Sequence, residues 1–519
     1  MSTLEELIAA LSDPAIYPGS PEQVEVRHTH ASVAFLAGDA VYKLKKPVNF
    51  GFLDYSTMTR RRRMCKLEVS LNQRLAPEVY LGVERVTRRA DGQYRLGGRG
   101  KVVDYLVHMR RLPEDAALSA RLRADAVEPA EIEAVGRKIA NFHRDAGRRG
   151  LFNAFGRPHL IARNVTENFE QTAEFVGRTI TPAAYTEIVT YASEFLGAHM
   201  AHFQERVDAG HICDGHGDLR CEHVYLTDPL QIIDCIEFND RLRYGDVASD
   251  LGFLAMDIEA HGAPELAALL VAYYEAVANA TLAPVLDFYC CYRAYVRGKV
   301  ASLRLQEANI SPTEAQATTR DAQRYFHLAR RYTRSPRKPQ LILMSGLSGS
   351  GKSTLARELS DILSAPRIES DTVRKQLAGL TPTSRRRAAP GADIYSAEMS
   401  QRVYAELLAT AERQLSRGRS VILDATYQRR EHRAPARDLA RRHGAEIRVL
   451  ACHGSDELIR DRLRQRAEDA TSTSDAGLDV YLDQLKHYEP VDELPPGEAI
   501  AVDAALDLEA QLNLVLDDL

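Results

Sequence analysis

The strongest chemical signal in the sequence is a glycine-rich run from Gly346 to Ser353. It fills the pattern G-x-x-x-x-G-K-[ST], the Walker A pattern, in which successive backbone N–H groups face phosphate oxygens. Lys352 is then placed to reach the β- and γ-phosphates of a nucleotide, and Ser353 to ligate Mg²⁺. We therefore predict that ATP and Mg²⁺ bind here, with the nucleotide held by Gly346, Ser348, Gly349, Ser350, Gly351, Lys352, Ser353 and Thr354.

Charged residues after this run add further groups suited to phosphoryl transfer. Asp424 follows three apolar strand formers, so it is placed like the Mg²⁺-binding carboxylate of a Walker B strand. Arg462 and Arg466 are four residues apart and share one helical face. With Asp371 and Arg374, this half of the chain resembles the P-loop kinases that include polynucleotide 5′-kinases, gluconate-type kinases and zeta-type toxins.

This resemblance implies a role for each charged residue. Asp371 would orient and deprotonate the acceptor hydroxyl, and Arg374 would bind the acceptor or a phosphate. Arg462 and Arg466 would belong to a lid that neutralises charge on the transferred phosphoryl group. Two other interpretations stay open: Asp371 caps a helix that begins at Thr372, and the two lid arginines form a solvated basic face.

A second set of suitable residues lies in the first half of the chain. Lys43 on a predicted strand and Glu68 on a predicted helix suit the positioning of nucleotide phosphates, and an ordinary ion pair explains them equally well. The loop from His216 to Asp218 precedes an apolar run that ends in Asp234. This half resembles the aminoglycoside phosphotransferase-like branch of the protein-kinase fold, which implies that Asp218 accepts the acceptor's proton and Asp234 holds Mg²⁺.

One position departs from that family's pattern. His223 stands five residues after Asp218, where the family has a metal-binding asparagine, and Mg²⁺ prefers oxygen ligands to imidazole. We retain His223 as a predicted metal ligand, with a first domain that only binds its ligand as the competing interpretation. A further alternative is a zinc cluster of Cys213, His216, Cys221 and His223, although their spacing matches no common zinc module.

Local patterns predict the elements that position these residues. Gly38 and Asp39 separate two strand-forming runs and predict a tight β-hairpin, with Lys43 and Lys45 on one face of its second strand. A helix is predicted from Ser56 to Leu75. Its apolar stripe consists of Met64, Leu67, Leu71 and Leu75. In the second half we predict buried strands at 341–345, 367–371, 420–424 and 447–452, and helices at 355–360, 396–415 and after Ser455.

Length and composition set the outer limits. The 519 residues, 45% of them hydrophobic, suit two or three domains, and a proline-containing basic run at 333–339 predicts a linker between domains at 1–332 and 340–519. The net charge of -5 argues against a general nucleic-acid coat. Seven irregularly spaced cysteines, no signal-peptide pattern and no long apolar run predict a cytoplasmic protein with reduced thiols and no membrane partner.

The whole chain is similar to bacterial fusions of an aminoglycoside phosphotransferase-like domain with a P-loop kinase domain. The predicted fold is therefore an α+β protein-kinase-like domain followed by an α/β P-loop kinase domain with a parallel sheet. Our leading hypothesis is an ATP-dependent kinase that phosphorylates a hydroxyl of a small molecule, such as a sugar or nucleoside. The alternatives are a polynucleotide 5′-hydroxyl kinase, with Arg385 to Arg387 as its basic groove, and a regulatory ATP-binding switch.

Overall fold

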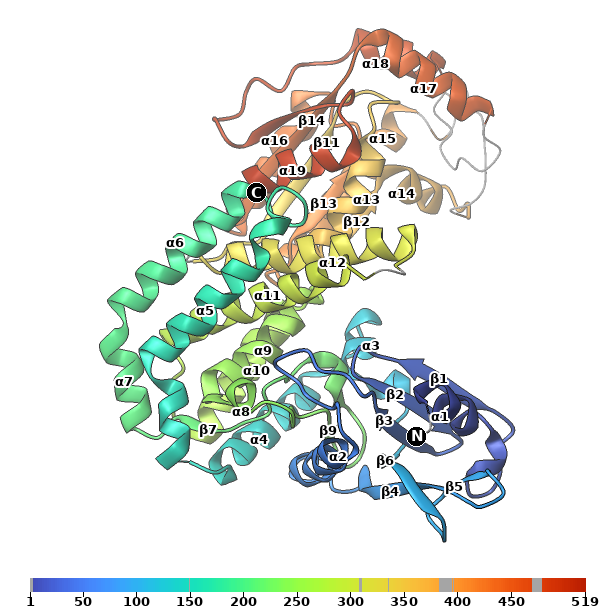
Figure 1. Ribbon diagram of the computed structural model, residues 1–519. Coiled ribbons are helices and arrows are strands. Elements are labelled where there is room, and N and C mark those ends of the chain that lie inside the picture. Colours follow the sequence, from blue (N-terminus) through green and yellow to red (C-terminus); the bar gives the residue numbers. More distant parts are fainter. Residues whose placement is uncertain are drawn as a thin grey trace. The chain divides into compact units, whose positions relative to one another are not determined.

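The chain divides into two compact units, each described here by itself. The computed structural model describes residues 3–148, 150–307, 310–334, 336–381, 394, 396–468 and 478–519 (Figure 1). The first unit comprises Met1–Asn164, Phe195–His261 and Leu266–Cys290, and the second comprises Val165–Glu194, Gly262–Glu265 and Cys291–Leu519. The linker at 333–339 stays a prediction.

The first unit begins with a six-stranded antiparallel sheet. Its strand order is β1-β2-β3-β6-β4-β5. The strands are β1 (Val24–His28), β2 (Ser32–Ala37), β3 (Ala40–Lys45), β4 (Tyr80–Arg88), β5 (Tyr94–Leu96) and β6 (Lys101–Arg110). The predicted hairpin is confirmed, because Ala37 pairs with Ala40 across a two-residue turn in which Gly38 has a φ of 61°. A positive φ is what this type of turn requires and what glycine allows.

Two helices cover the faces of this sheet because its side chains alternate. Helix α1 (Leu4–Leu11) packs Leu7 and Leu11 against a face that carries Phe35 and Leu44. Helix α2 (Met58–Asn72) packs on another cluster of side chains with Val107. The sheet therefore has an apolar layer on each face. Its strand β3 carries Lys43 and Lys45.

The apolar stripe predicted for α2 is only partly correct. Leu71 is buried, but Met64 and Leu67 are half-exposed. The buried face instead includes the polar residues Arg61, Glu68 and Asn72 beside Cys65 and Val69. Arg61 bonds to Asp104 at 2.8 Å, and Glu68 pairs with lysines, so these charges are satisfied inside the protein. Buried ion pairs therefore displaced the apolar periodicity on which the prediction relied.

The remainder of the chain before the second sheet is mostly helical. Two small antiparallel pairs, β7 (Ile212–Asp214) with β10 (Tyr244–Asp246) and β8 (Val224–Tyr225) with β9 (Gln231–Ile232), frame the loop that carries Asp218. The helices are α3 (Leu118–Arg123), α4 (Pro129–Asp145), α5 (Pro158–Thr172), α6 (Pro182–Ala198), α7 (Met200–Asp208), α8 (Asp240–Arg243), α9 (Val247–Ala260), α10 (Pro264–Ala278), α11 (Val285–Arg304) and α12 (Pro312–Arg331).

The second unit contains a five-stranded parallel sheet, as predicted. Its order is β12-β13-β11-β14-β15, formed by β11 (Gln340–Ser345), β12 (Arg367–Glu369), β13 (Val421–Asp424), β14 (Glu446–His453) and β15 (Ala499–Asp503). The helices among these strands are α13 (Lys352–Leu363), α14 (Ser370–Leu377), α15 (Ala397–Leu415), α16 (Arg430–Arg442), α17 (Asp456–Glu468), α18 (Leu478–Lys486) and α19 (Leu508–Asp518). Every residue of β11 is buried, as expected for a central parallel strand.

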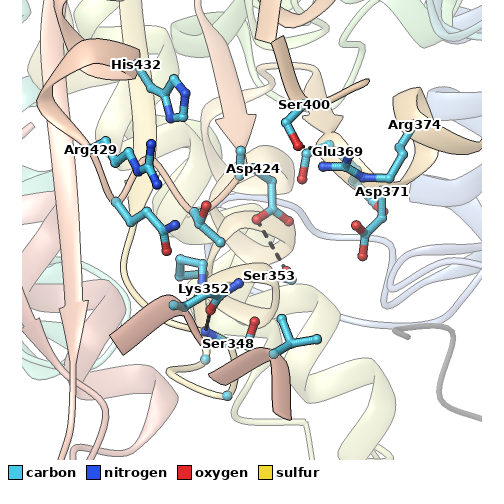
Figure 2. Close-up of a pocket in the computed structure, with 18 of the residues that line it drawn as sticks. Ser348, Lys352, Ser353, Glu369, Asp371, Arg374, Ser400, Asp424, Arg429 and His432 are labelled. Atoms are coloured by element: carbon cyan, nitrogen blue, oxygen red, sulfur yellow. Dashed lines mark hydrogen bonds between the residues drawn. The ribbon is translucent and has the colours of Figure 1, made fainter. Parts of the chain in front are cut away.

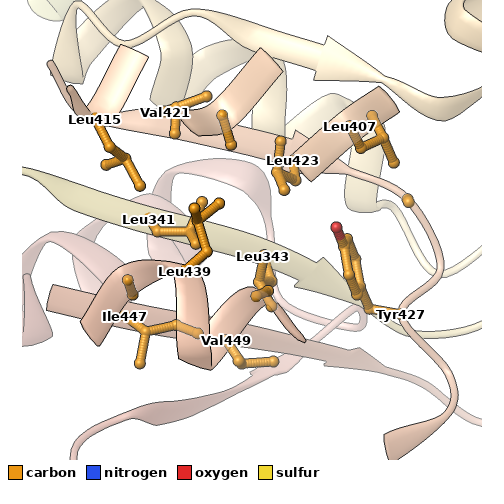
Figure 3. Close-up of a cluster of buried hydrophobic side chains, with 14 of the residues drawn as sticks. Leu341, Leu343, Leu407, Leu415, Val421, Leu423, Tyr427, Leu439, Ile447 and Val449 are labelled. Carbon is orange, nitrogen blue, oxygen red and sulfur yellow. The ribbon is translucent and has the colours of Figure 1, made fainter. Parts of the chain in front are cut away.

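Both faces of this sheet are packed. On one face Leu341 and Leu343 meet Leu407 of α15 and Leu439 of α16 (Figure 3). On the other, Ile342 belongs to a cluster with side chains of α13 and α19. The two apolar layers hold the strands in place, so the loops at their carboxyl ends start from fixed positions.

All seven cysteines are buried thiols, none of them in a disulfide. Among the described residues, no helix combines the length and the apolar character needed to cross a membrane.

Candidate functional site

The glycine-rich run forms the loop between β11 and α13. Its three glycines Gly346, Gly349 and Gly351 have φ values of 137°, 86° and 85°, which side chains rarely tolerate. A Cβ atom on Gly346 would also lie 2.2 Å from the carbonyl oxygen of Cys452. The loop ends at the N-terminus of α13, where backbone N–H groups and the helix dipole favour an anion. Its backbone geometry therefore fits a bound phosphate.

Lys352 and Ser353, the first residues of α13, face this loop. The Lys352 ammonium is buried and donates to the carbonyl oxygen of Leu347 at 2.7 Å. The Ser353 hydroxyl donates, at 3.3 Å, to Oδ1 of Asp424, the last residue of β13. Burial raises the pKa of Asp424. A hydroxyl and a carboxylate supply the oxygen ligands that Mg²⁺ takes, so the donor set fits the predicted ion.

The other predicted residues of the loop occupy different positions. Ser348 and Thr354 line the cavity described next, and the Ser348 N–H donates to Gln484 Oε1 of α18 at 2.8 Å. The Ser350 side chain is buried and lies 3.5 Å from the Lys352 ammonium. Their contact with a nucleotide stays a prediction.

A cavity of about 780 Å³ joins this loop to the predicted acceptor side. Asp371 and Arg374 of α14 line it together with Lys352 and Asp424. In Figure 2, Asp371 and Arg374 lie on one side of Asp424, and Arg429 lies on the other. Lys352, Asp371, Arg374 and Asp424 thus line one cavity.

The position of Asp371 differs in detail from the prediction. Strand β12 ends at Glu369, so Asp371 lies in the first turn of α14 and not at the strand end. The N-cap of α14 is Glu369, which rules out the alternative that Asp371 caps this helix. Within the described part of the chain, the Asp371 carboxylate has no hydrogen-bond partner. A carboxylate in this state is available to accept a proton or a hydrogen bond.

Two of the three predicted arginines line the cavity within the described residues. Arg374 Nη1 donates to the carbonyl oxygen of Ile394 at 3.0 Å, which orients its guanidinium. Arg462 lines the cavity and donates to the carbonyl oxygen of Ala504 at 2.8 Å. Arg466 lies in α17, but its side chain is outside the described residues. The lid role of Arg462 and Arg466 stays a prediction.

Sequence reasoning missed a second wall of the cavity. His432 stacks on Tyr404 with ring centroids 3.9 Å apart, and the Tyr404 hydroxyl lies 3.2 Å from Thr426 Oγ1. Burial lowers the pKa of His432, which favours a neutral imidazole. Arg429 also lines this wall. Thr426, Arg429 and His432 follow β13, whereas Tyr404 lies on α15. Ligands bind beyond the carboxyl ends of parallel strands, and this rule could have indicated the residues after β13.

In the first unit, a chain of charges links three predicted residues. Lys43 Nζ lies 3.0 Å from Glu68 Oε1 and 2.8 Å from Asp234 Oδ1. Burial alone would raise the pKa of Asp234, but the Lys43 ammonium holds it well below its usual range. Asp234 has a φ of 65°, a conformation in which a non-glycine residue is uncommon. The predicted pairing of Lys43 with Glu68 is therefore present.

A second lysine in this network was not predicted to take part. Lys45 is 1% exposed, and its ammonium lies 2.6 Å from Glu68 Oε2 and pairs with Glu237. The Tyr55 hydroxyl also contacts Lys45, at 3.2 Å. Strand alternation placed Lys45 on the Lys43 face, but nothing in the sequence pattern indicated Glu237 or Tyr55 as its partners.

The loop around Asp218 is held by hydrogen bonds on both sides. Asp250 accepts from the backbone N–H groups of His216 and Gly217 at 2.5 and 2.8 Å. The His216 imidazole donates from Nε2 to the carbonyl oxygen of Ile233 at 2.9 Å, and burial lowers its pKa to about 4. Arg220 binds both carboxylate oxygens of Asp218, at 3.0 and 3.2 Å. This arginine was missed by the sequence analysis.

The zinc alternative is wrong. His223 Nδ1 bonds to the carbonyl oxygen of Asp218 at 2.8 Å, and His216 is engaged with Ile233. Among the described residues, one group of three or more has all its potential metal-binding atoms within 4.8 Å of one another. It consists of Cys221, Asp257 and His261, and so includes only one of the four predicted residues.

Comparisons with known proteins agree with this two-part architecture. Residues 62–289 match the model of the phosphotransferase enzyme family, and residues 341–491 match a model described as an AAA domain. The chain is 33% identical over 461 residues to uncharacterized protein Rv2004c of Mycobacterium tuberculosis, covering 88% of this chain and 89% of that protein. The chain belongs to that protein's family.

Solved structures similar to parts of the chain include a kinase and a phosphotransferase. A gluconokinase from Sinorhizobium meliloti is 24% identical, with 35% of this chain and 91% of that chain covered and a TM-score of 0.26. Aminoglycoside 2′-phosphotransferase-IIIa is 15% identical, with 62% and 98% covered and a TM-score of 0.38. The chain has a kinase-like phosphotransferase domain and a P-loop kinase domain, and is a kinase-type enzyme. Such families use ATP.

Proposed function

We propose that the second unit transfers the γ-phosphoryl group of ATP to a hydroxyl of a small molecule, either a sugar or a nucleoside-like compound. The observation that carries this proposal is the shared cavity, which puts Asp371 in the same space as Lys352 and Asp424. Its volume of about 780 Å³ falls within the range of small-molecule sites. A site with one wall for phosphate and another for the acceptor is what a kinase requires.

Each wall has a distinct task in this proposal. Asp371 accepts the proton of the attacking hydroxyl, and Arg374 orients the acceptor or a phosphate oxygen. Ser353 and Asp424 would hold Mg²⁺, and Lys352 with the glycine-rich loop would hold the phosphates. Bound MgATP would supply the phosphoryl group and neutralise part of its charge.

The composition of the acceptor wall supports a polyhydroxylated acceptor. Its polar side chains can both donate and accept hydrogen bonds; they are Ser400, Gln401, Thr426 and Gln428. A polynucleotide acceptor would need an extended basic groove, and the arginines predicted for it, Arg385 to Arg387, lie outside the described residues. We propose that the first unit is either a second phosphotransferase or a binding domain that has lost catalysis.

Replacement of Asp371 by Asn tests the proposal. The full chain is incubated with labelled ATP, Mg²⁺ and separate pools of sugars, aminoglycosides, nucleosides and 5′-hydroxyl oligonucleotides. We expect one small-molecule pool to be labelled, and Asp371→Asn to lower that transfer by about 10²- to 10⁴-fold with ATP affinity unchanged.

Asp361→Asn, on the exposed side of α13, is the matched control and should transfer at the wild-type rate. Labelling of the oligonucleotide pool alone would replace the small-molecule acceptor by a polynucleotide. ATP hydrolysis without labelling of any pool, unchanged in Asp371→Asn, would contradict both kinase interpretations and leave the ATP-binding switch.

A further inference from the structure

The orientation of the His223 ring is set by its neighbours. Its Nδ1 lies 2.8 Å from the carbonyl oxygen of Asp218, and a carbonyl only accepts, so Nδ1 carries the hydrogen. Arg220 Nη2 lies 3.4 Å from the other ring nitrogen, Nε2. With Nδ1 engaged by the Asp218 carbonyl oxygen, Nε2 is the ring nitrogen that a metal ion could reach.

Nε2 lies close to two carboxylates. His223 Nε2 is 3.6 Å from Asp234 Oδ2 and 3.6 Å from Glu222 Oε1. Two ligands that are each about 2.1 Å from one metal ion lie roughly 3.0 to 3.5 Å apart, for ligand angles between 90° and 110°. Asp234 and His223 thus need to move by only a few tenths of an ångström to share an ion.

This donor set does not fit a second Mg²⁺ ion. Mg²⁺ takes oxygen ligands in a near-ideal octahedron and has little affinity for imidazole, whereas Mn²⁺ and later divalent metals accept nitrogen. An asparagine, the residue of the resembled family at this position, would offer an amide oxygen instead. The exchange of oxygen for nitrogen alters which ion the position selects.

We propose that the first unit holds a nitrogen-accepting divalent ion, of the Mn²⁺ class, between His223 Nε2 and Asp234. This inference goes beyond the proposed function, because it concerns metal choice in the first unit and does not depend on the acceptor used by the second. In this proposal His223 supplies a nitrogen ligand to the ion, which an oxygen-bearing side chain would not do.

Arg220 is the cation that faces Nε2 in the structure, and the ion has to displace it from this nitrogen. Its two bonds to Asp218 and its ion pair with Glu222 do not involve His223, so the guanidinium can retain them. If Arg220 instead remained as the permanent positive charge at this position, no metal would bind to nitrogen there. The two arrangements therefore differ in whether a bound metal ion is coordinated by a nitrogen atom, which can be measured.

Pulsed electron paramagnetic resonance of the full chain loaded with MnCl₂ measures that property. We expect hyperfine coupling of Mn²⁺ to one directly bound ¹⁴N nucleus in the wild type, and loss of this coupling in His223→Asn. Ser353 and Asp424 supply only oxygen, so an ion held by them gives no such coupling. In the same variant, Mg²⁺ should compete with Mn²⁺ more effectively than in the wild type.

His261→Asn is the matched control, because His261 Nδ1 also bonds a backbone carbonyl oxygen, that of Asp257, at 2.7 Å. It should keep the coupling. Loss of the coupling in His261→Asn but not in His223→Asn would assign the ion to the cluster of Cys221, Asp257 and His261, and would overturn the proposal. A wild type without ¹⁴N coupling would overturn it as well, and this measurement requires no variant to fold.

Discussion

Asp371 in the second unit and Asp218 in the first are the two carboxylates predicted to take a proton from a hydroxyl, and their surroundings differ. Asp371 lines a cavity of about 780 Å³ and has no hydrogen-bond partner among the described residues. Asp218 is bound through both oxygens by Arg220. Asp371 is therefore available to an acceptor hydroxyl, whereas Asp218 must first give up a contact with Arg220.

The same contrast applies to the two lysines predicted to hold phosphate. Lys352 donates to a neutral carbonyl oxygen of its own loop, at 2.7 Å. Lys43 is paired with two carboxylates, Glu68 and Asp234. A phosphate competes more easily with a neutral acceptor than with a carboxylate, because an ammonium–carboxylate pair adds the attraction of two opposite charges to the hydrogen bond. The second unit is therefore expected to carry most of the phosphoryl transfer.

Removal of Lys352, compared with removal of Lys43, gives the largest effect expected from this comparison. We expect Lys352→Ala to lower phosphoryl transfer by about 10³-fold, because a preorganised positive group at the transferred phosphate is lost. Lys43→Ala should change total transfer less than twofold. Initial rates with labelled ATP measure both, and Lys66→Ala, at an exposed position of α2, is the control.

The opposite order, with Lys43→Ala the more damaging substitution, would break the comparison. Transfer that survives Lys352→Ala would have to come from the first unit. In that case, Asp218→Asn in the Lys352→Ala background should abolish the remainder. If the remainder persists in this double variant, Asp218 is not its catalytic base.

The sequence predicted the second site better than the first, for a physical reason. A phosphate-binding loop is formed by consecutive residues, so Gly346 to Ser353 could be recognised from local spacing alone. Asp371 and Asp424 end or follow strands whose parallel packing brings their carboxyl ends to one edge. The predicted strand 367–371 ends at Glu369, so Asp371 belongs to α14, and the cavity wall with Arg429 and His432 was missed.

The first site depends on partners far apart in the sequence. Lys45 meets Glu237 across 192 residues, and no periodicity or motif links the two. The buried face of α2 was only partly predicted, because Arg61 is paired with Asp104 and apolar spacing does not reveal such a pair. Arg220 was overlooked because its role depends on the fold of a loop. Long-range electrostatic pairing was therefore what the sequence could not supply.

A smaller effect is expected on stability from Glu68→Gln. Glu68 is 1% exposed and contacts the ammonium groups of both Lys43 and Lys45. Removal of its charge leaves the buried Lys45 and the half-buried Lys43 with one carboxylate fewer, so the free energy of unfolding should fall by about 3 kcal/mol. The loss is measured by denaturant-induced unfolding, from the transition of the first unit.

Two other variants test whether this cost is specific to the first site. Glu133→Gln removes an exposed ion pair with Arg137 and should cost at most about 0.5 kcal/mol. Asp371→Asn removes a carboxylate without a described partner and should not destabilise the second unit. If Glu68→Gln is as stable as wild type, the first site is not held by its internal charges, and the contrast between the sites is lost.

The last expected effect concerns the pH dependence of the first unit's stability. The pKa of His216 is lowered to about 4 by burial, whereas an unfolded histidine titrates near 6.5. The unfolded state therefore binds the proton more readily, and stability present above pH 6.5 is lost as the pH falls to about 4, by up to about 3 kcal/mol. His216→Asn removes this titration, so its first-unit transition should depend less on pH between 6.5 and 4 than the wild-type transition. His28→Asn, at an exposed position, should keep the wild-type slope, and equal slopes in all three proteins would contradict the burial of a neutral His216.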